Sequence, residues 1–228
     1  MRRTSDTLVL LAFPFLLALF ALWFSVPRLV SAVTLLPSQA TLEAVGKGET
    51  ISERAVKNAI SGRKAAAGWV ADPGTFAEIG SLHLVEAERA GYDTPEGTRL
   101  LEASIAAERQ SLSLSPAQPY AWVQLFQARI ALEGPSEDLS RIFTMSVKTA
   151  PTEPRLVMRR LELGLAIWFF LNPEATESLR SQAVIAAQHF PTRLAELAKK
   201  RYALQLVYDA LADKPELRQR FTRAYLSL

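Results

Sequence analysis

The sequence predicts an all-α chain, with an N-terminal transmembrane helix followed by an α-solenoid of antiparallel helical hairpins. Three observations lead to this prediction. An uncharged apolar segment lies near the amino terminus, the remaining chain shows no sustained alternation of apolar and polar residues, and prolines recur where helices begin. The composition agrees, since 49% of the 228 residues are hydrophobic and 21% are charged, which suits a chain that buries a core.

The apolar segment, TLVLLAFPFLLALFALWFSV, covers residues 7–26 and carries no charge. Because a helix rises about 1.5 Å per residue, this segment spans a hydrocarbon layer of about 30 Å. Arg2 and Arg3 precede it, and Trp23 lies near its far end, where aromatic rings favour the interface. We expect a single-pass anchor in the lipid of an inner membrane, with residues 1–6 as a cytoplasmic tip and the remaining chain in the periplasm.

A cleaved signal peptide is the alternative for the same segment. The sequence LVSA ends at Ala32 and offers Val30 and Ala32 at the positions typical of a cleavage site. The apolar run is longer than the usual signal-peptide core of about 7–15 residues, which favours an uncleaved anchor. Both interpretations send the rest of the chain across the membrane.

Residues 27–50 are expected to be a linker with a turn at VGKGET, and residues 51–228 to form the helical domain. Proline at the first helical position loses no needed N–H group, and a preceding Asp, Thr or Asn accepts from the free N–H groups of the first turn. This pattern predicts helices over about 51–67, 74–90, 95–112, 119–133, 136–149, 154–171, 174–189, 192–211 and 215–226. Short connections make neighbouring helices pack as antiparallel hairpins.

A repeat is visible in the helical part. The segments that open at Asp72, Ser115 and Ala150 resemble one another, and the last two begin 35 residues apart. Helix pairs with a period near 34 residues are typical of tetratricopeptide-type solenoids.

Over residues 119–151 the chain resembles the tetratricopeptide repeat family. Phe126 and Arg129 depart from the pattern, since the family prefers a small residue and Tyr there. The resemblance extends over about residues 72–190 and implies a hairpin fold that presents a binding surface. The matching positions are Trp122, Leu125, Phe143, Ser146 and Pro151.

A second resemblance involves longer stretches of the chain. A membrane anchor, then LSLSPAQPYAW, SVKTAPTEPRLVMRRLELGLAIW and an LNPE helix start, is similar to small repeat-like bacterial envelope proteins that accompany exopolysaccharide or O-antigen polymerisation and export. The resemblance implies an assisting role in polysaccharide production.

The chain offers few groups for catalysis or metal binding. It has no cysteine, and its two histidines, His83 and His189, lie 106 residues apart. HExxH, GxSxG, P-loop and GxGxxG motifs are missing. The basic residues near the carboxyl end lack the density of a nucleic-acid patch. We therefore predict a protein that is not an enzyme and uses no cofactor, no metal and no nucleic acid.

The predicted binding surface follows from the solenoid, because solenoids bind along a concave face lined by the first helix of each hairpin. Arg155 and Arg159 lie four residues apart on one helix face, with Glu162 within reach. Such a face is either an ion-paired, solvated surface or an anion-binding stripe suited to an acidic peptide or sugar. The candidate residues are Tyr120, Gln124, Gln127, Arg155, Arg159 and Glu162.

The apolar stretch LGLAIWFFLN, residues 163–172, is too short for a second membrane span, since nine helical residues extend only about 13.5 Å. At least one of Phe169 and Phe170 is expected to be exposed and to be a candidate contact with a partner or the bilayer surface. The core is expected to contain Leu165, Ile167, Trp168 and Leu171.

These observations favour a non-enzymatic scaffold that presents its helical surface to an envelope partner, such as a polysaccharide polymerase or an export component. One alternative is a structural accessory subunit of another inner-membrane complex. A second alternative is an enzyme acting on cell wall or glycan, which would need convergent carboxylates in a deep pocket.

Overall fold

The computed structural model describes residues 3–228, with side chains from residue 14 onward. The described residues form only helices and turns, which confirms the predicted all-α class. Two short 3₁₀ helices, η1 (Glu137–Leu139) and η2 (Trp168–Phe170), interrupt the series. The α-helices are α1 (Arg3–Gly46), α2 (Glu53–Trp69), α3 (Pro73–Ala90), α4 (Pro95–Leu114), α5 (Pro119–Glu133), α6 (Ser140–Thr149), α7 (Pro154–Ala166), α8 (Pro173–His189), α9 (Pro191–Lys200), α10 (Leu204–Ala210) and α11 (Pro215–Leu226).

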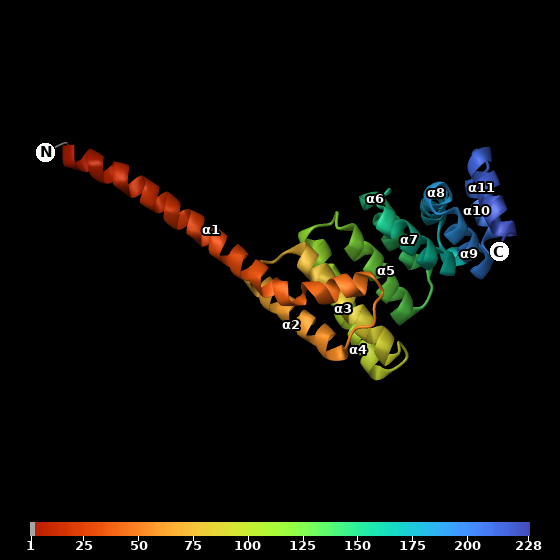
Figure 1. Cartoon of the computed structure of the whole chain (residues 1–228), viewed down its shortest axis with the longest axis horizontal. Helices are drawn as coiled ribbons and strands as arrows, with labels where there is room; N and C mark the ends of the chain where they lie inside the picture. Colours follow the sequence, from red (N-terminus) through yellow and green to blue (C-terminus); the bar gives the residue numbers. More distant parts are fainter. Residues whose placement is uncertain (1–2) are drawn as a thin grey trace.

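The first part of helix α1 projects away from the helical body, its last part bends to lie along the body, and the carboxyl terminus lies at the opposite end of the molecule (Figure 1). From Pro14 to Gly46 it is long and apolar enough to cross a membrane. The structure differs from the linker expected over residues 27–50. Helix α1 continues through Gly46, and only the turn after it is irregular. Of the expected cytoplasmic tip, residues 1–2 lie outside the described residues.

The second half of α1 is held against the body by buried polar contacts. Ser31 Oγ donates to the carbonyl oxygen of Ala66 in α2 at 3.2 Å. The fully buried Arg63 of α2 donates through one nitrogen to Ser38 Oγ of α1 and through Nε to Glu78 Oε2 of α3, the latter at 2.8 Å. These hydrogen bonds join three helices, so residues 31–46 belong to the folded domain.

The hairpins follow one another along the body. Helix α3 packs along α4, α5 along α6 and α7 along α8, while α3, α5, α7 and α9 contact one another in that order. The expected helix starts are confirmed at three prolines, because the side chains of Asp72, Thr94 and Asn172 accept from the N–H three residues ahead.

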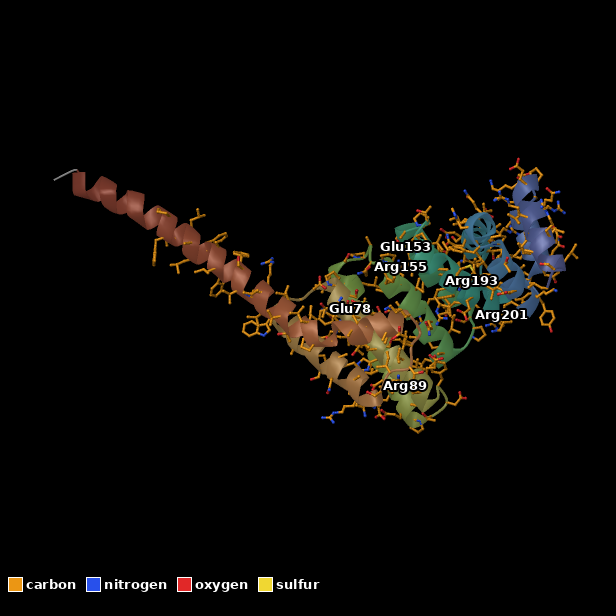
Figure 2. The ribbon with its side chains drawn as sticks, viewed as in Figure 1. Glu78, Arg89, Glu153, Arg155, Arg193 and Arg201 are labelled. Atoms are coloured by element: carbon orange, nitrogen blue, oxygen red, sulfur yellow. The ribbon has the colours of Figure 1, made fainter. Side chains whose placement is uncertain are left out.

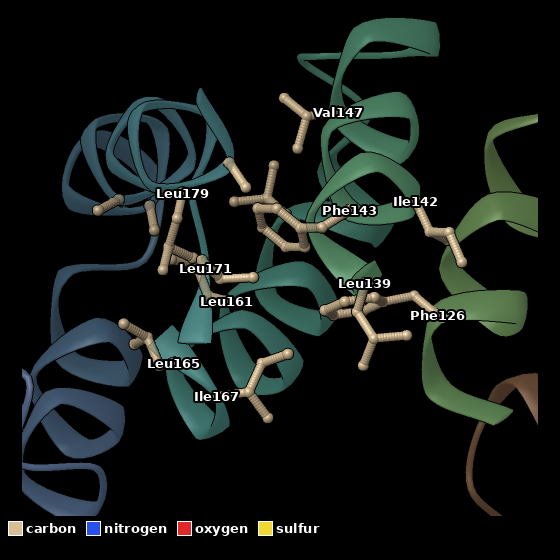
Figure 3. Close-up of a cluster of buried hydrophobic side chains, with 14 of the residues drawn as sticks. Phe126, Leu139, Ile142, Phe143, Val147, Leu161, Leu165, Ile167, Leu171 and Leu179 are labelled. Atoms are coloured by element: carbon tan, nitrogen blue, oxygen red, sulfur yellow. The ribbon is translucent and has the colours of Figure 1, made fainter. Parts of the chain in front are cut away.

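The core lies between the two helices of each hairpin and continues from one hairpin to the next. Phe126 of α5 and Phe143 of α6 meet with ring centroids 5.2 Å apart (Figure 3). A Cβ atom on Gly164 would lie 2.9 Å from Phe143 Cε2 and 2.7 Å from Leu179 Cδ1, so glycine lets α7 approach both neighbours. Close packing of this kind fixes the spacing of the hairpins.

A buried arginine closes the end of α6. Arg160 of α7 is 1% exposed and donates to the carbonyl oxygen of Ala150 at 2.8 Å and to that of Ser146. Gln182 of α8 accepts from Arg160 at 3.3 Å and donates to the carbonyl oxygen of Pro151 at 2.9 Å. Burial lowers the pKa of Arg160 to about 10, so the guanidinium stays charged at neutral pH and satisfies helix-end carbonyl groups.

Two predicted helices are shorter than expected. The helix expected over 154–171 ends at Ala166. Asn172 must leave the helical region because it precedes Pro173, and the N–H of Asn172 is bound by Ser140 Oγ at 3.0 Å. The helix expected over 192–211 breaks at Tyr202, whose φ of 52° is left-handed. Tyr202 is 91% exposed, so no core contact opposes the break.

Candidate binding groove

The first part of the site is a hollow of about 300 Å³ between α3, α5 and α7, next to the end of α1. Five of the eight candidate residues lie together here, on two different helices. Its lining residues are Val45, Gly46, Ser81, Leu84, Val85, Glu88, Tyr120, Val123, Gln124, Gln127, Arg155, Leu156 and Arg159.

A second hollow of about 420 Å³ lies between α7 and α9. It shares Arg155 and Arg159 with the first hollow, so the two form one trough along α3, α5, α7 and α9. We call this trough the α3–α9 groove. Figure 2 shows Arg155 and Arg193 on its α7 and α9 sides. The second hollow is lined by Pro154, Arg155, Met158, Arg159, Glu162, Phe190, Arg193, Glu196, Leu197 and Lys200.

The α3–α9 groove has an apolar floor. Leu84 of α3, Val123 of α5 and Leu156 of α7 are each at most 5% exposed and line the first hollow. The polar candidates stand above this floor, with Tyr120 36% exposed at the rim. The Tyr120 hydroxyl lies 3.5 Å from Glu153 Oε1, which is too long for a strong hydrogen bond. An apolar floor with a polar rim is the usual anatomy of a protein-binding surface.

Charge in the groove is unevenly balanced. Arg159 pairs with Glu162 at 2.6 Å, as the solvated-face interpretation requires, and such exposed pairs add little stability. Arg155, Arg193 and Lys200 form no ion pair within residues 14–228. The second hollow therefore carries an excess of positive charge, as the anion-binding interpretation requires.

A buried carboxyl group lies beneath the groove. Glu108 of α4 is fully buried, and burial raises its pKa well above the usual value, because the charged form is poorly solvated there. The amide nitrogen of Gln124, in the orientation that satisfies its surroundings, donates to Glu108 Oε1 and to the carbonyl oxygen of Ala77 at 2.9 Å. Gln124 thus connects α3, α4 and α5 and is only partly available to a ligand.

The remaining two candidates lie elsewhere. Phe169 and Phe170 belong to η2, at the far end of α7, and line neither hollow of the groove. They are 77% and 50% exposed, and Phe169 stacks on Trp168 with ring centroids 3.8 Å apart. The expected burial of Leu165, Ile167 and Leu171 is confirmed, whereas Trp168 is only half-buried. The structure thus separates an exposed aromatic pair from the groove.

The sequence-based candidates did not include the α9 side of the groove. Arg193 and Lys200 belong to the basic residues near the carboxyl end, and their sequence context does not place them in a groove. The segment FPTRLAEL begins at Phe190, 40 residues after the repeat segment at Ala150, and this spacing is a signal for α9 as another first helix.

His83 and Glu86 lie apart from the groove, on α3. His83 is 7% exposed, its Nδ1 has no partner, and burial lowers its pKa to about 4. Burial also raises the pKa of Glu86. No group of three metal-ligating side chains occurs among the residues that the structure describes. Comparisons of the chain with protein-family models, curated proteins and solved structures found no match.

Proposed function

We propose that this protein is a non-enzymatic, membrane-anchored scaffold whose α3–α9 groove binds an acidic segment of an envelope protein. One observation carries the proposal: four consecutive first helices line a continuous groove with an apolar floor and basic side chains that lack ion-pair partners. The side-by-side order of α3, α5, α7 and α9 supports the expected solenoid arrangement.

Membrane attachment is the second part of the proposal. Helix α1 is long and apolar enough to span a bilayer, and Arg2 and Arg3 precede its most apolar part. This charge placement favours a cytoplasmic amino terminus, which directs α2–α11 to the periplasmic side of an inner membrane.

The pathway is proposed from the sequence resemblance to envelope proteins that accompany polysaccharide polymerisation and export. A scaffold in such a pathway holds a polymerase or export component in place and needs no active site. The groove fits this role, because extended grooves with hydrophobic floors bind peptide segments and unpaired basic residues select acidic ones.

Photo-crosslinking of the full chain in native membranes tests the proposal. A photoreactive residue at Gln127, inside the groove, should capture a partner protein, whereas one at Arg141 on α6 should not. The double substitution Arg155→Glu with Arg193→Glu should then abolish capture, because it reverses charge on two sides of the groove. The matched double substitution Arg109→Glu with Arg141→Glu, on second helices, should leave capture unchanged. Equal capture from the probes at Gln127 and Arg141, and equal capture by the two double variants, would reject the groove as the binding site.

The exposed aromatic pair favours a second candidate function, that of a structural accessory subunit. Phe169 and Phe170 offer an apolar contact away from the groove. In this case, a photoreactive residue at Phe169 captures the partner, and charge reversal in the groove has no effect.

A further inference from the structure

A regular apolar stripe follows one face of α1 and is left open by the rest of the molecule. Its residues repeat with alternating spacings of three and four, which is the pattern of a coiled-coil seam. Each side chain is between 46% and 68% exposed. We call this stripe the α1 seam, which consists of Leu19, Leu22, Val26, Leu29, Val33 and Leu36.

The second half of the seam extends beyond the expected membrane span. The span ends at residue 26, and Arg28 follows it, so Leu29, Val33 and Leu36 lie on the water side. These three side chains are 64%, 55% and 68% exposed. A row of large apolar side chains in water is a surface that another element covers.

Helix α2 does not cover the seam, because it packs on the opposite face of α1. With Val26 and Val33 at heptad position a, Ser31 and Ser38 fall at position f, which points away from a and d. Ser31 donates to Ala66 at 3.2 Å, and Ser38 accepts from Arg63, both in α2. The body is therefore attached on one side of α1, and the exposed seam side chains lie on the other side.

We propose that the α1 seam pairs with the same seam of a second copy of this chain, as a parallel two-stranded coiled coil that continues out of the membrane. The choice of residues specifies this pairing, since β-branched Val at a and Leu at d favour parallel dimers. Leu19, Val26 and Val33 occupy a, so two of the three a positions are Val, while Leu22, Leu29 and Leu36 occupy d.

Charge and height also favour a second copy over another protein. The flanking e and g positions carry no charge, so two identical helices meet no like charges; they are Ala18, Trp23, Ser25, Val30, Ala32, Pro37 and Gln39. A second copy presents its seam at the same height, because the same anchor sets its depth.

The area is adequate for a specific contact. At roughly 60–120 Å² of apolar surface for each buried Val or Leu, six positions on each of two helices bury about 700–1,400 Å², which overlaps the range of specific interfaces.

The absence of cysteine makes a direct test possible in the full chain. Single cysteines are placed at the seam by Leu29→Cys and Leu36→Cys, and at the neighbouring exposed c position by Arg28→Cys as the control. Native membranes are treated with a short bismaleimide crosslinker. We expect roughly ten times more crosslinked dimer at the seam positions, because a and d side chains meet across the pair while c side chains point outward.

Equal yields at seam and control positions would overturn the proposal, as would the absence of dimer, which would show that lipid covers the seam. A product with the mass of a different protein would also overturn it. The result is independent of the proposed function: Arg155→Glu with Arg193→Glu should leave the dimer intact, because neither residue belongs to the α1 seam.

Discussion

A Cβ atom on Gly80 of α3 would lie 2.6 Å from Cδ of Glu108 on α4, so the missing side chain makes room for a buried carboxyl group. The two helices approach closely at this point, where Ser104 Oγ also donates to the carbonyl oxygen of Gly80 at 2.9 Å. Glu108 in turn accepts from Gln124, which lines the α3–α9 groove. The packing of one hairpin thus positions a groove residue.

The substitution Gly80→Ala should lower the free energy of unfolding by about 1–3 kcal/mol, because the added methyl group displaces a fully buried side chain. Chemical denaturation of the full chain in detergent micelles, followed by circular dichroism, measures this change. Gly68→Ala on α2 is the control, since nothing lies within 4 Å of its Cβ position. The control should be neutral or stabilising by up to about 1 kcal/mol. Equal destabilisation by both substitutions would contradict the described packing.

The buried Glu108 should make the domain less stable as the pH rises. Its pKa is raised in the folded chain, so folding retains a proton that the unfolded chain releases above the ordinary value of 4.5. The stabilisation that protonated Glu108 contributes is fully present below pH 4.5. It decreases with rising pH until the pH has passed the raised pKa of the folded state. Glu108→Gln removes the titrating group and should flatten this slope, with its largest gain in stability at alkaline pH. Denaturation curves at several pH values measure the difference, and parallel pH profiles for both proteins would disprove it.

The buried His83 should make the domain less stable as the pH falls, which is the opposite of the dependence expected from Glu108. Burial lowers its pKa from 6.5 to about 4, so its contribution is complete above pH 6.5 and is lost as the pH falls through about 4. The loss amounts to about 3 kcal/mol at most, from the size of the shift. His83→Gln, which does not titrate, should remove this part of the acid destabilisation in thermal melts. His189→Gln is the comparison, because it removes an exposed imidazole that lies outside the core.

Loss of Arg160 should destabilise the junction of α6, α7 and α8. Arg160→Met leaves the carbonyl groups of Ala150 and Ser146 without donors in a buried place, which costs about 2–4 kcal/mol. Arg155→Met, on the exposed face of the same helix, should change the free energy of unfolding by no more than about 0.5 kcal/mol. Urea denaturation compares the two proteins. Similar midpoints would show that the buried guanidinium does not hold these helices together.

The exposed aromatic pair should matter for contact and not for folding. Phe169→Ser together with Phe170→Ser should lower the free energy of unfolding by less than about 1 kcal/mol, because both rings are largely outside the core. Leu165→Ser is the comparison, since Leu165 is 1% exposed and its loss should cost several times more. Thermal melts of the three proteins rank them. A large loss from the double substitution would mean that the rings pack against the body.

The helices were largely predictable from the sequence because proline and the preceding polar residue determine where a helix begins. Asp72, Thr94 and Asn172 cap their helices as expected. The break at Tyr202 was not predictable, because neither glycine nor proline marks it and only the packing of α9 on α11 selects it. The full extent of α1 to Gly46 was not predictable from residues 27–50, because it depends on contacts with other elements, such as those that Ser31 and Ser38 make with α2.

The candidate site was predictable as far as helical periodicity reaches. Tyr120, Gln124 and Gln127 share one face of α5, and this face does line the groove. Which faces of different helices meet is set by tertiary packing, so the contribution of α9 and the hydrogen bond between Gln124 and Glu108 required the structure. Both Phe169 and Phe170 are exposed, whereas the apolar run alone predicts only that at least one ring turns outward.

The continuous path of α1 has a mechanical consequence. In the proposed topology, the twenty residues from Pro27 to Gly46 continue the helix from the bilayer to the body, and Val45 and Gly46 at their end line the groove. Ser31 and Ser38 bind α2 and so hold the body against this part of α1. In the proposed topology, this attachment limits how far the groove can move from the bilayer, and a partner would present its acidic segment within that range.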